Sequence, residues 1–198
     1  MDRKSEILEL ARKKGVIRPL DVKAEGISCQ YLYRLVRQGD LARIGRGLYS
    51  LPDTLTSEFS SLVEVAKRVP NAVVCLLSSL QFHSLTTQLP SRVWIAIEGT
   101  NWKPVIDSPP VRIIRFSGDA FHFGIQRHEI ARVSVRIYSP AKTVADCFKF
   151  RNKIGLDISL EALRETWKQR KASMDEIWEA ATVCRVANVM RPYLEALV

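Results

Sequence analysis

The chain has 198 residues, with 30 Lys and Arg against 21 Asp and Glu, and a formal net charge of +9. Its 46% apolar and 26% charged residues form a globular composition, which excludes disorder over most of the chain. The longest apolar run, residues 72–77, is far short of the ~20 residues of a membrane span, and the charged N-terminus lacks a signal core, so we expect a cytoplasmic protein.

The positive charge is concentrated near the N-terminus. Residues 1–50 hold 11 Lys and Arg and 6 Asp and Glu, a net charge of +5, whereas the remaining residues carry +4. A surface that is merely solvated would spread the excess more evenly. The pattern therefore favours an N-terminal region that binds a polyanion.

Three helices are expected in the first forty residues. Apolar residues at helical spacing, followed by three cations and Gly15, predict a helix over residues 3–14. Pro19 and Gly26 bound a short helix over residues 20–25. Ser28 is a strong N-cap, and Gly39 ends the third helix. This order, with its tight turn, predicts a helix-turn-helix.

The third helix has two different faces. Its apolar stripe consists of Cys29, Leu32, Leu35 and Val36. The opposite face carries Gln30, Tyr31, Arg34, Arg37 and Gln38. Gln and Arg can contact base edges in a bidentate way, and Arg and Tyr can also bind phosphate, so this face is expected to contact DNA. Tyr33 lies between the two faces and receives no DNA-binding role.

Residues 41–51 predict a β-hairpin that breaks at Gly45-Arg46-Gly47, with Arg43 and Arg46 near its tip. A hairpin after a recognition helix is a wing, which contacts phosphate or the minor groove. The alternative is a small helical domain whose basic face docks an acidic protein partner. The predicted DNA-binding residues are Ser28, Gln30, Tyr31, Arg34, Arg37, Arg43 and Arg46.

The predicted fold class is α+β, with a winged helix-turn-helix over residues 1–52 and a larger mixed domain over residues 57–198. Polar residues and Pro52 mark the boundary. Ser57 is expected to cap a helix that ends at Pro70. Further helices are expected over residues 78–85, after Ser139, around residues 160–167, and from Ser173 to Val189. Strands are expected at residues 93–97, 111–116, 121–125 and 133–138, a loop at 99–110, and either strand or helix at 73–77.

No metal or cofactor site is predicted. None of the cysteines forms a Cys-x-x-Cys pair or has a histidine at ligand spacing. Each lies in an apolar stretch, so we expect free buried thiols at Cys29, Cys75, Cys147 and Cys184.

No catalytic site is predicted either, so we expect a protein that is not an enzyme. His83 is interpreted as structural, and His122, on a predicted strand, and His128, in a predicted turn, are expected to face solvent. A metal nuclease is an open alternative, but it rests only on Glu98 and on Lys103 beyond a loop.

A second basic cluster follows Ser139. Lys142 and Lys149 are seven residues apart and therefore share one helix face. This cluster is either a second DNA surface or a solvated face beside Asp146. Its members are Lys142, Lys149, Arg151 and Lys153.

The motifs together resemble the AbiEi family, the antitoxin half of bacterial abortive-infection (type IV) toxin–antitoxin systems. The N-terminal resemblance lies in residues 26–28, 31–35 and 39–49, which include the Gly-Ile-Ser turn and the glycine-bracketed wing. The C-terminal resemblance lies in residues 78–90 and 138–147.

This resemblance implies a DNA-binding antitoxin that represses its own operon by binding inverted repeats at the promoter, with a role in phage defence. It also implies functional pairing with a nucleotidyltransferase-like toxin, without requiring a stable complex. Inverted repeats suit two copies, which could assemble as a dimer on DNA. A solitary transcriptional regulator is the alternative within the family.

Overall fold

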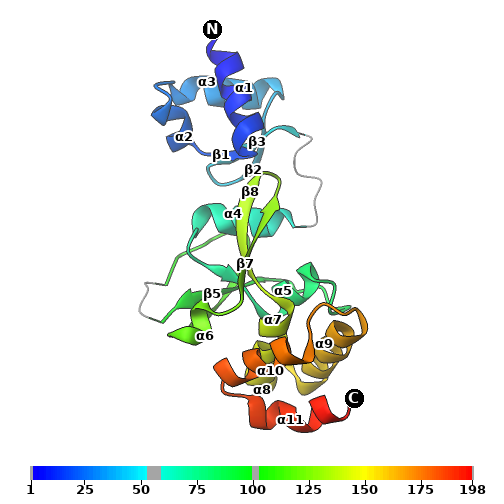
Figure 1. Ribbon diagram of the computed structural model, residues 1–198. Helices are drawn as coiled ribbons and strands as arrows, with labels where there is room; N and C mark the ends of the chain where they lie inside the picture. Colours follow the sequence, from blue (N-terminus) through cyan, green and yellow to red (C-terminus); the bar gives the residue numbers. More distant parts are fainter. Residues whose placement is uncertain (1, 53–58, 100–102, 198) are drawn as a thin grey trace. The chain divides into compact units, whose positions relative to one another are not determined.

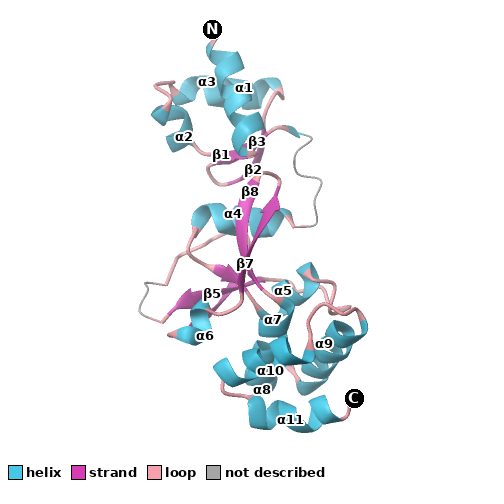
Figure 2. Cartoon of the chain, in the orientation of Figure 1, coloured by secondary structure: helices cyan, strands magenta, loops and turns pink. Residues whose placement is uncertain are grey.

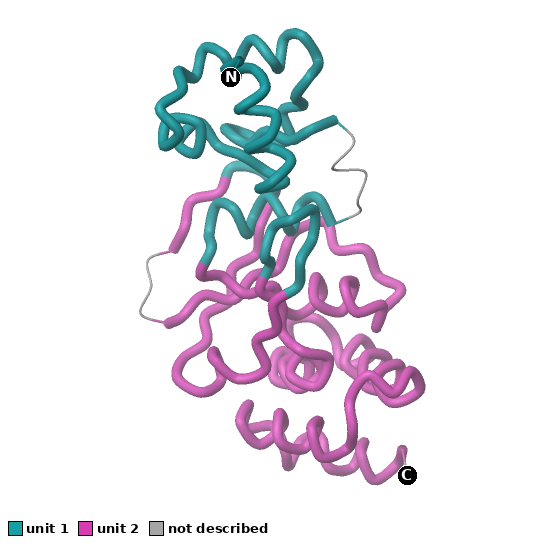
Figure 3. Tube along the Cα trace, turned by 45° about the horizontal axis from the view of Figure 1, so that its top comes forward, with its two compact units in different colours: residues 1–70, 107–109, 128–135 teal, residues 71–106, 110–127, 136–198 magenta. Residues whose placement is uncertain are grey.

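The computed structural model describes residues 2–52, 59–99 and 103–197. The chain forms two compact units, which are coloured separately in Figure 3. The first consists of residues 1–70, 107–109 and 128–135, and the second of residues 71–106, 110–127 and 136–198. In the described part of the chain, every helix is too short or too polar to cross a bilayer.

The three helices expected at the N-terminus are present in the first unit (Figure 1). Ser28 caps the third helix, because its hydroxyl oxygen accepts a hydrogen bond from the Gln30 amide at 3.4 Å. Gly39 ends this helix in the left-handed conformation, with φ 80°. The helices are α1 (Arg3–Lys14), α2 (Pro19–Ala24) and α3 (Cys29–Gln38).

A small antiparallel sheet completes this arrangement. Its strands β1 (Val16–Ile17), β2 (Ala42–Gly45) and β3 (Leu48–Ser50) lie in the order β1-β3-β2. The pairing of Gly45 with Leu48 leaves Arg46 and Gly47 as a two-residue turn, and Gly47 has φ 72°. The predicted winged helix-turn-helix is therefore confirmed. Strand β1 was not predicted, because two residues show no alternation.

One apolar core holds the helices of the first unit to the sheet. Leu32 and Leu35 of α3 are 0% and 2% exposed, so the apolar stripe predicted from the sequence is buried there. Burying one such side chain stabilises the fold by roughly 1.5–3 kcal/mol. The other members of this core are Ile7, Leu10, Ala11, Ile17, Val22, Ile27, Leu41 and Tyr49.

The first unit continues past the boundary expected at residues 52–57. It includes α4 (Ser60–Arg68), because an Arg68 Nη2–H of this helix donates to the Arg46 carbonyl oxygen of the wing at 3.3 Å. The predicted cap Ser57 and the boundary residues 53–57 lie outside the described residues.

The second unit contains most of a five-stranded sheet, whose strands are among those drawn in magenta in Figure 2. The strands lie in the order β6-β5-β4-β8-β7. Strand β4 pairs antiparallel with β5 and parallel with β8, and β5 pairs parallel with β6. The strands predicted at residues 93–97, 111–116 and 133–138 are confirmed. The bounds are β4 (Val73–Val74), β5 (Val93–Glu98), β6 (Val111–Phe116), β7 (Ile125–Ile130) and β8 (Val133–Tyr138).

The turn between β7 and β8 belongs to the first unit, together with the strand ends beside it. Ala131 and Arg132 have φ 49° and 61°, the positive values of a type I′ turn. An Arg132 Nη1–H donates to the Arg12 carbonyl oxygen at 2.6 Å. The backbone of Gly15 packs so tightly against the Ala131 carbonyl that a side chain would not fit there.

Two predictions for the second unit were wrong. The strand expected at residues 121–125 begins only at Ile125, because Gly118 and Gly124, with φ 54° and 71°, bracket a one-turn helix that contains Phe121 and His122. The long last helix is two helices, because Arg185 adopts φ 60° and interrupts it. The helices are α5 (Leu76–Phe82), α6 (Asp119–His122), α7 (Pro140–Lys149), α8 (Arg151–Ile154), α9 (Leu156–Lys168), α10 (Met174–Val183) and α11 (Ala187–Glu195).

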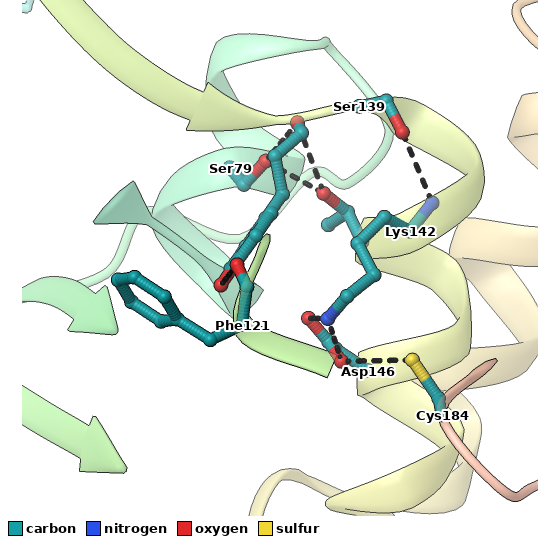
Figure 4. A network of polar contacts seen from close by, with 8 residues as sticks. Ser79, Phe121, Ser139, Lys142, Asp146 and Cys184 are labelled. Atoms are coloured by element: carbon teal, nitrogen blue, oxygen red, sulfur yellow. Dashed lines mark hydrogen bonds and ion pairs between the residues drawn. The ribbon is translucent and has the colours of Figure 1, made fainter. Parts of the chain in front are cut away.

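A buried polar network joins α5, α7 and the end of β8 (Figure 4). The carbonyl oxygen of Tyr138 is 3.1 Å from Ser79 Oγ and 2.8 Å from His83 Nε2, and the Ser79 and Thr143 hydroxyls are 2.7 Å apart. The Tyr138 hydroxyl donates to the Phe121 carbonyl at 2.7 Å. His83 therefore has the structural role expected from the sequence.

An ion pair lies in the same core. The Lys142 ammonium is 2.6 Å from both carboxylate oxygens of Asp146, and both side chains are 0% exposed (Figure 4). The ammonium also lies 4.5 Å from the Phe116 ring centroid and 4.3 Å from that of Tyr138. Each charge of this pair is thus compensated by groups that are themselves buried.

Cys184 extends this pair toward α10. Its thiol donates to Asp146 Oδ1 at 3.4 Å. Burial and the neighbouring Asp146 raise the pKa of the Cys184 thiol to about 12, so the thiol keeps its proton and serves as the donor. Burial also raises the pKa of the Asp146 carboxyl, and the Lys142 ammonium opposes that rise.

We predict that Lys142→Met destabilises the protein by about 3–5 kcal/mol, because it leaves the buried Asp146 carboxylate without its counter-charge. The double variant Lys142→Met/Asp146→Leu should recover much of this loss. Urea unfolding measures the stability of both variants relative to the wild type. Lys168→Ala is the control, since this exposed side chain should change stability by only about 0.5 kcal/mol. A Lys142→Met variant as stable as this control would contradict the prediction.

Candidate nucleic-acid interface

The residues predicted to bind DNA all lie in the first unit, and the side chains of all seven are exposed. Five come from α3 or its N-cap, and two come from the wing. They are Ser28, Gln30, Tyr31, Arg34 and Arg37 on the helix, and Arg43 and Arg46 on the wing.

The exposed face of α3 is partly organised by contacts within the helix. The Arg34 guanidinium lies 5.5 Å from the ring centroid of Tyr31, which is one turn earlier. This cation–π contact holds two of the predicted contact residues together. The Ser28 hydroxyl oxygen accepts a hydrogen bond from the backbone N–H of Gln30, so the backbone of α3 fixes the position of this side chain.

Tyr33 is 46% exposed and belongs to the edge of the core. Its ring packs edge-on against Tyr49 of β3, with the centroids 6.3 Å apart. This agrees with its expected position between the two faces of α3.

The wing presents Arg43 from β2 and Arg46 from the turn. Arg43 Nε–H donates to the Gly45 carbonyl oxygen at 3.3 Å, which holds the side chain along the hairpin. The Arg46 side chain is 78% exposed and forms an ion pair with Asp107 at 3.2 Å. An ion pair this exposed contributes only about 0–1 kcal/mol, so Arg46 can exchange Asp107 for a phosphate.

Glu64 and Arg68 of α4 support the wing, and the sequence did not identify them. Arg68 Nη2 is 2.8 Å from Glu64 Oε1, and the two side chains are only 18% and 9% exposed, respectively. Burial raises the pKa of the Glu64 carboxyl, and Arg68 opposes the rise. The available sequence signal was the spacing of four residues between Glu64 and Arg68, which places both side chains on one face of the helix.

The predicted second surface contains one error, because Lys142 is 0% exposed and pairs with Asp146. Residues seven apart do share a helix face, but α7 is buried along residues 140–148, and that face points into the core. The other three members are partly or fully accessible. Lys149 and Lys153 are exposed, whereas Arg151 is half-buried and donates to the Phe148 carbonyl at 2.9 Å.

The residues that were considered for catalysis or metal binding do not form a metal cluster within the described part of the chain. Glu98 Oε1 is 3.2 Å from His122 Nε2 at an exposed position, and His128 lies on β7 instead of in a turn. Within residues 2–52, 59–99 and 103–197, no cluster of three His, Cys, Asp or Glu could hold a metal ion. All four cysteines are free; Cys29 is half-buried, and the others are buried as predicted.

Gly45 is required for a steric reason. Its φ is not positive, but a Cβ at this position would collide with the Glu64 carboxylate. We predict that Gly45→Ala destabilises the protein by about 1–3 kcal/mol, because the Glu64 carboxylate must leave its buried place beside Arg68 or the wing must shift. In a Glu64→Ala background, the same substitution should lower the free energy of unfolding by less. Thermal or urea unfolding of the four proteins of this cycle measures the coupling, and equal penalties in both backgrounds would contradict the proposed collision.

Comparison with known proteins agrees with this architecture. Residues 5–52 match the model of a family described as "Transcriptional regulator, AbiEi antitoxin". No curated protein matches the chain. The crystal structure of the RV2827C protein from Mycobacterium tuberculosis is similar, with a TM-score of 0.52 and 13% sequence identity, and the match covers 93% of this chain and 77% of that chain.

At this level of identity the structural similarity shows a shared fold and nothing more. The family match lies over the helices and wing described above. It agrees with the resemblance to the AbiEi antitoxin family that the N-terminal motifs predicted, over residues 5–52 of the chain.

Proposed function

We propose that this protein binds duplex DNA in a sequence-specific way and represses its own operon. The observation that carries the proposal is the exposed face of α3, where Gln30, Tyr31 and Arg34 stand opposite the buried Leu32 and Leu35. A helix of this kind, followed by a wing with two exposed arginines, has the parts that major-groove recognition requires.

The proposed roles follow from side-chain chemistry. Helix α3 enters the major groove, where Gln30 can pair with adenine N6 and N7 and Arg34 with guanine O6 and N7. Each bidentate pair discriminates against the wrong base by roughly 1–3 kcal/mol. Tyr31 donates its hydroxyl to a phosphate, and Ser28 contacts the backbone at the start of the helix.

The remaining arginines supply affinity. Arg37 follows Arg34 on the exposed face, and Arg43 and Arg46 extend along the wing. In the proposal they bind phosphates or the minor groove. Each neutralised phosphate contributes roughly −0.9 to the slope of log affinity against log salt concentration.

We further propose that the operator is an inverted repeat bound by two copies, with half-site centres separated by about 10–10.5 base pairs or a multiple of this. The protein then acts in the cytoplasm, without catalysis of its own, as the antitoxin of a type IV abortive-infection system. The family match supports the regulator and antitoxin roles. The pairing with a nucleotidyltransferase-like toxin rests on the resemblance alone.

The first test is binding to the DNA upstream of the gene, measured by fluorescence anisotropy across a salt series. Arg34→Ala should lose preference for the promoter over random duplex, because it removes a base contact. Arg43→Ala should weaken binding to every duplex alike and reduce the salt slope by about 1, because it removes a phosphate contact.

Arg164→Ala, on the exposed surface of α9, removes the same charge from the second unit and is the matched control. It should leave binding unchanged. Salt-insensitive binding, or no preference for the promoter in the wild type, would overturn the proposal. Retention of an acidic protein after DNase treatment, without duplex binding, would instead indicate the protein-docking alternative.

The second test concerns the antitoxin role. If the neighbouring gene encodes a nucleotidyltransferase-like protein, its expression should arrest growth, and co-expression of this protein should restore it. Gln30→Ala/Arg34→Ala should abolish promoter repression but retain neutralisation, because the two activities use different residues. If co-expression of the wild-type protein does not relieve the growth arrest, this protein is not the antitoxin of that toxin. The solitary-regulator alternative would then remain.

A further inference from the structure

A cavity of about 550 Å³ lies in the second unit, a size typical of small-molecule sites. Its wall is built from the ends of several elements: the last residues of β6, the start of α6, the last residue of α7, and the end of α10. The side chains that matter for its chemistry are Arg115, Phe116, Asp119, Lys149 and Arg185.

The charge of this cavity is strongly unbalanced. Arg115, Lys149 and Arg185 converge on it, and the only carboxylate in its described lining is Asp119, which leaves a net charge of +2. Among the described residues, Lys149 and Arg185 form no ion pair. Cations that line one hollow repel each other, and an anion within it would remove that repulsion.

The helix ends that carry two of these cations are joined by the buried network. Cys184, next to Arg185, donates to Asp146, which is one turn before Lys149 (Figure 4). The Arg115 side chain is oriented by its own contact, because its Nη1–H donates to the Gly99 carbonyl at 2.7 Å. The backbone that carries the three cations is therefore fixed before a ligand binds, although the side chains are exposed.

Favourable interaction with helix dipoles would explain the positions of only two of the three cations. Lys149 in the last turn of α7 and Arg185 just after α10 each suit the negative end of a helix dipole. Arg115 lies at the end of a strand, where no helix dipole favours a cation. The helix argument also gives no reason for the three groups to surround one hollow.

We propose that this cavity binds a phosphorylated small molecule, with a diphosphate group between Arg115, Lys149 and Arg185. Arginine binds phosphate oxygens in a bidentate way, and lysine acts as a compact counter-charge. The concave shape favours a small ligand over the backbone of a duplex. The diphosphate could belong to a nucleotide or be free pyrophosphate.

Isothermal titration calorimetry of the full chain with inorganic pyrophosphate and with ADP, at constant ionic strength, tests this proposal. The wild type should bind one molecule saturably. Lys149→Ala/Arg185→Ala should weaken binding about tenfold or more, because each substitution removes a charge-assisted contact. Arg164→Ala/Lys168→Ala, which removes two exposed charges from α9, should leave the affinity within about twofold.

Tighter binding of ADP than of pyrophosphate would identify a nucleotide as the ligand, and equal binding would identify a free diphosphate; both support the proposal. The absence of saturable binding to the wild type would overturn the proposal. An equal loss of affinity in Lys149→Ala/Arg185→Ala and in Arg164→Ala/Lys168→Ala would also overturn it. So would a loss of duplex affinity in Lys149→Ala/Arg185→Ala without pyrophosphate binding to the wild type, because the cations would then serve DNA. None of these outcomes depends on the α3 interface.

Discussion

Burial of the apolar stripe of α3 determines which side chains the first unit presents to solvent. Leu32 and Leu35 are inside the core, so the helix can point only its opposite face outward. The same core contains Tyr49 of β3, which fixes the hairpin that carries Arg43 and Arg46. A rotation of α3 by one residue would bury a charged group, and the loss of apolar contacts would oppose it. The exposed arginines are thus positioned by residues that are themselves buried.

The second unit is organised by a different interaction, the Lys142–Asp146 ion pair. Desolvating two charges is expensive, and the pair is retained only with excellent geometry and further partners. Both conditions are met, since two 2.6 Å contacts, two aromatic rings and the Cys184 thiol surround it. The pair, which lies on α7, therefore contacts Phe116 of β6, Tyr138 of β8 and the C-cap residue of α10.

The sequence predicted best where local chemistry is strong. Ser28 and Gly39 bound α3 as expected, and the glycine-bracketed arginine formed the wing turn. Strand β1 was missed, since two residues that pair with β3 carry no local signal. Lys142 was misplaced because a spacing rule shows which residues share a face, but tertiary packing decides whether that face is buried. The place of Glu64 beside Gly45 of the wing was missed for the same reason, because these two residues are distant in the sequence and only tertiary packing brings them together.

The composition of the first unit also has a consequence for the order of synthesis. Its core elements emerge from the ribosome first, but residues 107–109 and 128–135, which include the Asp107 and Arg132 contacts, emerge much later. At roughly 5–20 residues per second, translation takes several seconds to pass from residue 70 to residue 135. During that time the helices and wing exist without the β-turn that packs against Gly15. A nascent or truncated chain that ends at residue 70 therefore contains the apolar core of the first unit but lacks the later segments that pack against it.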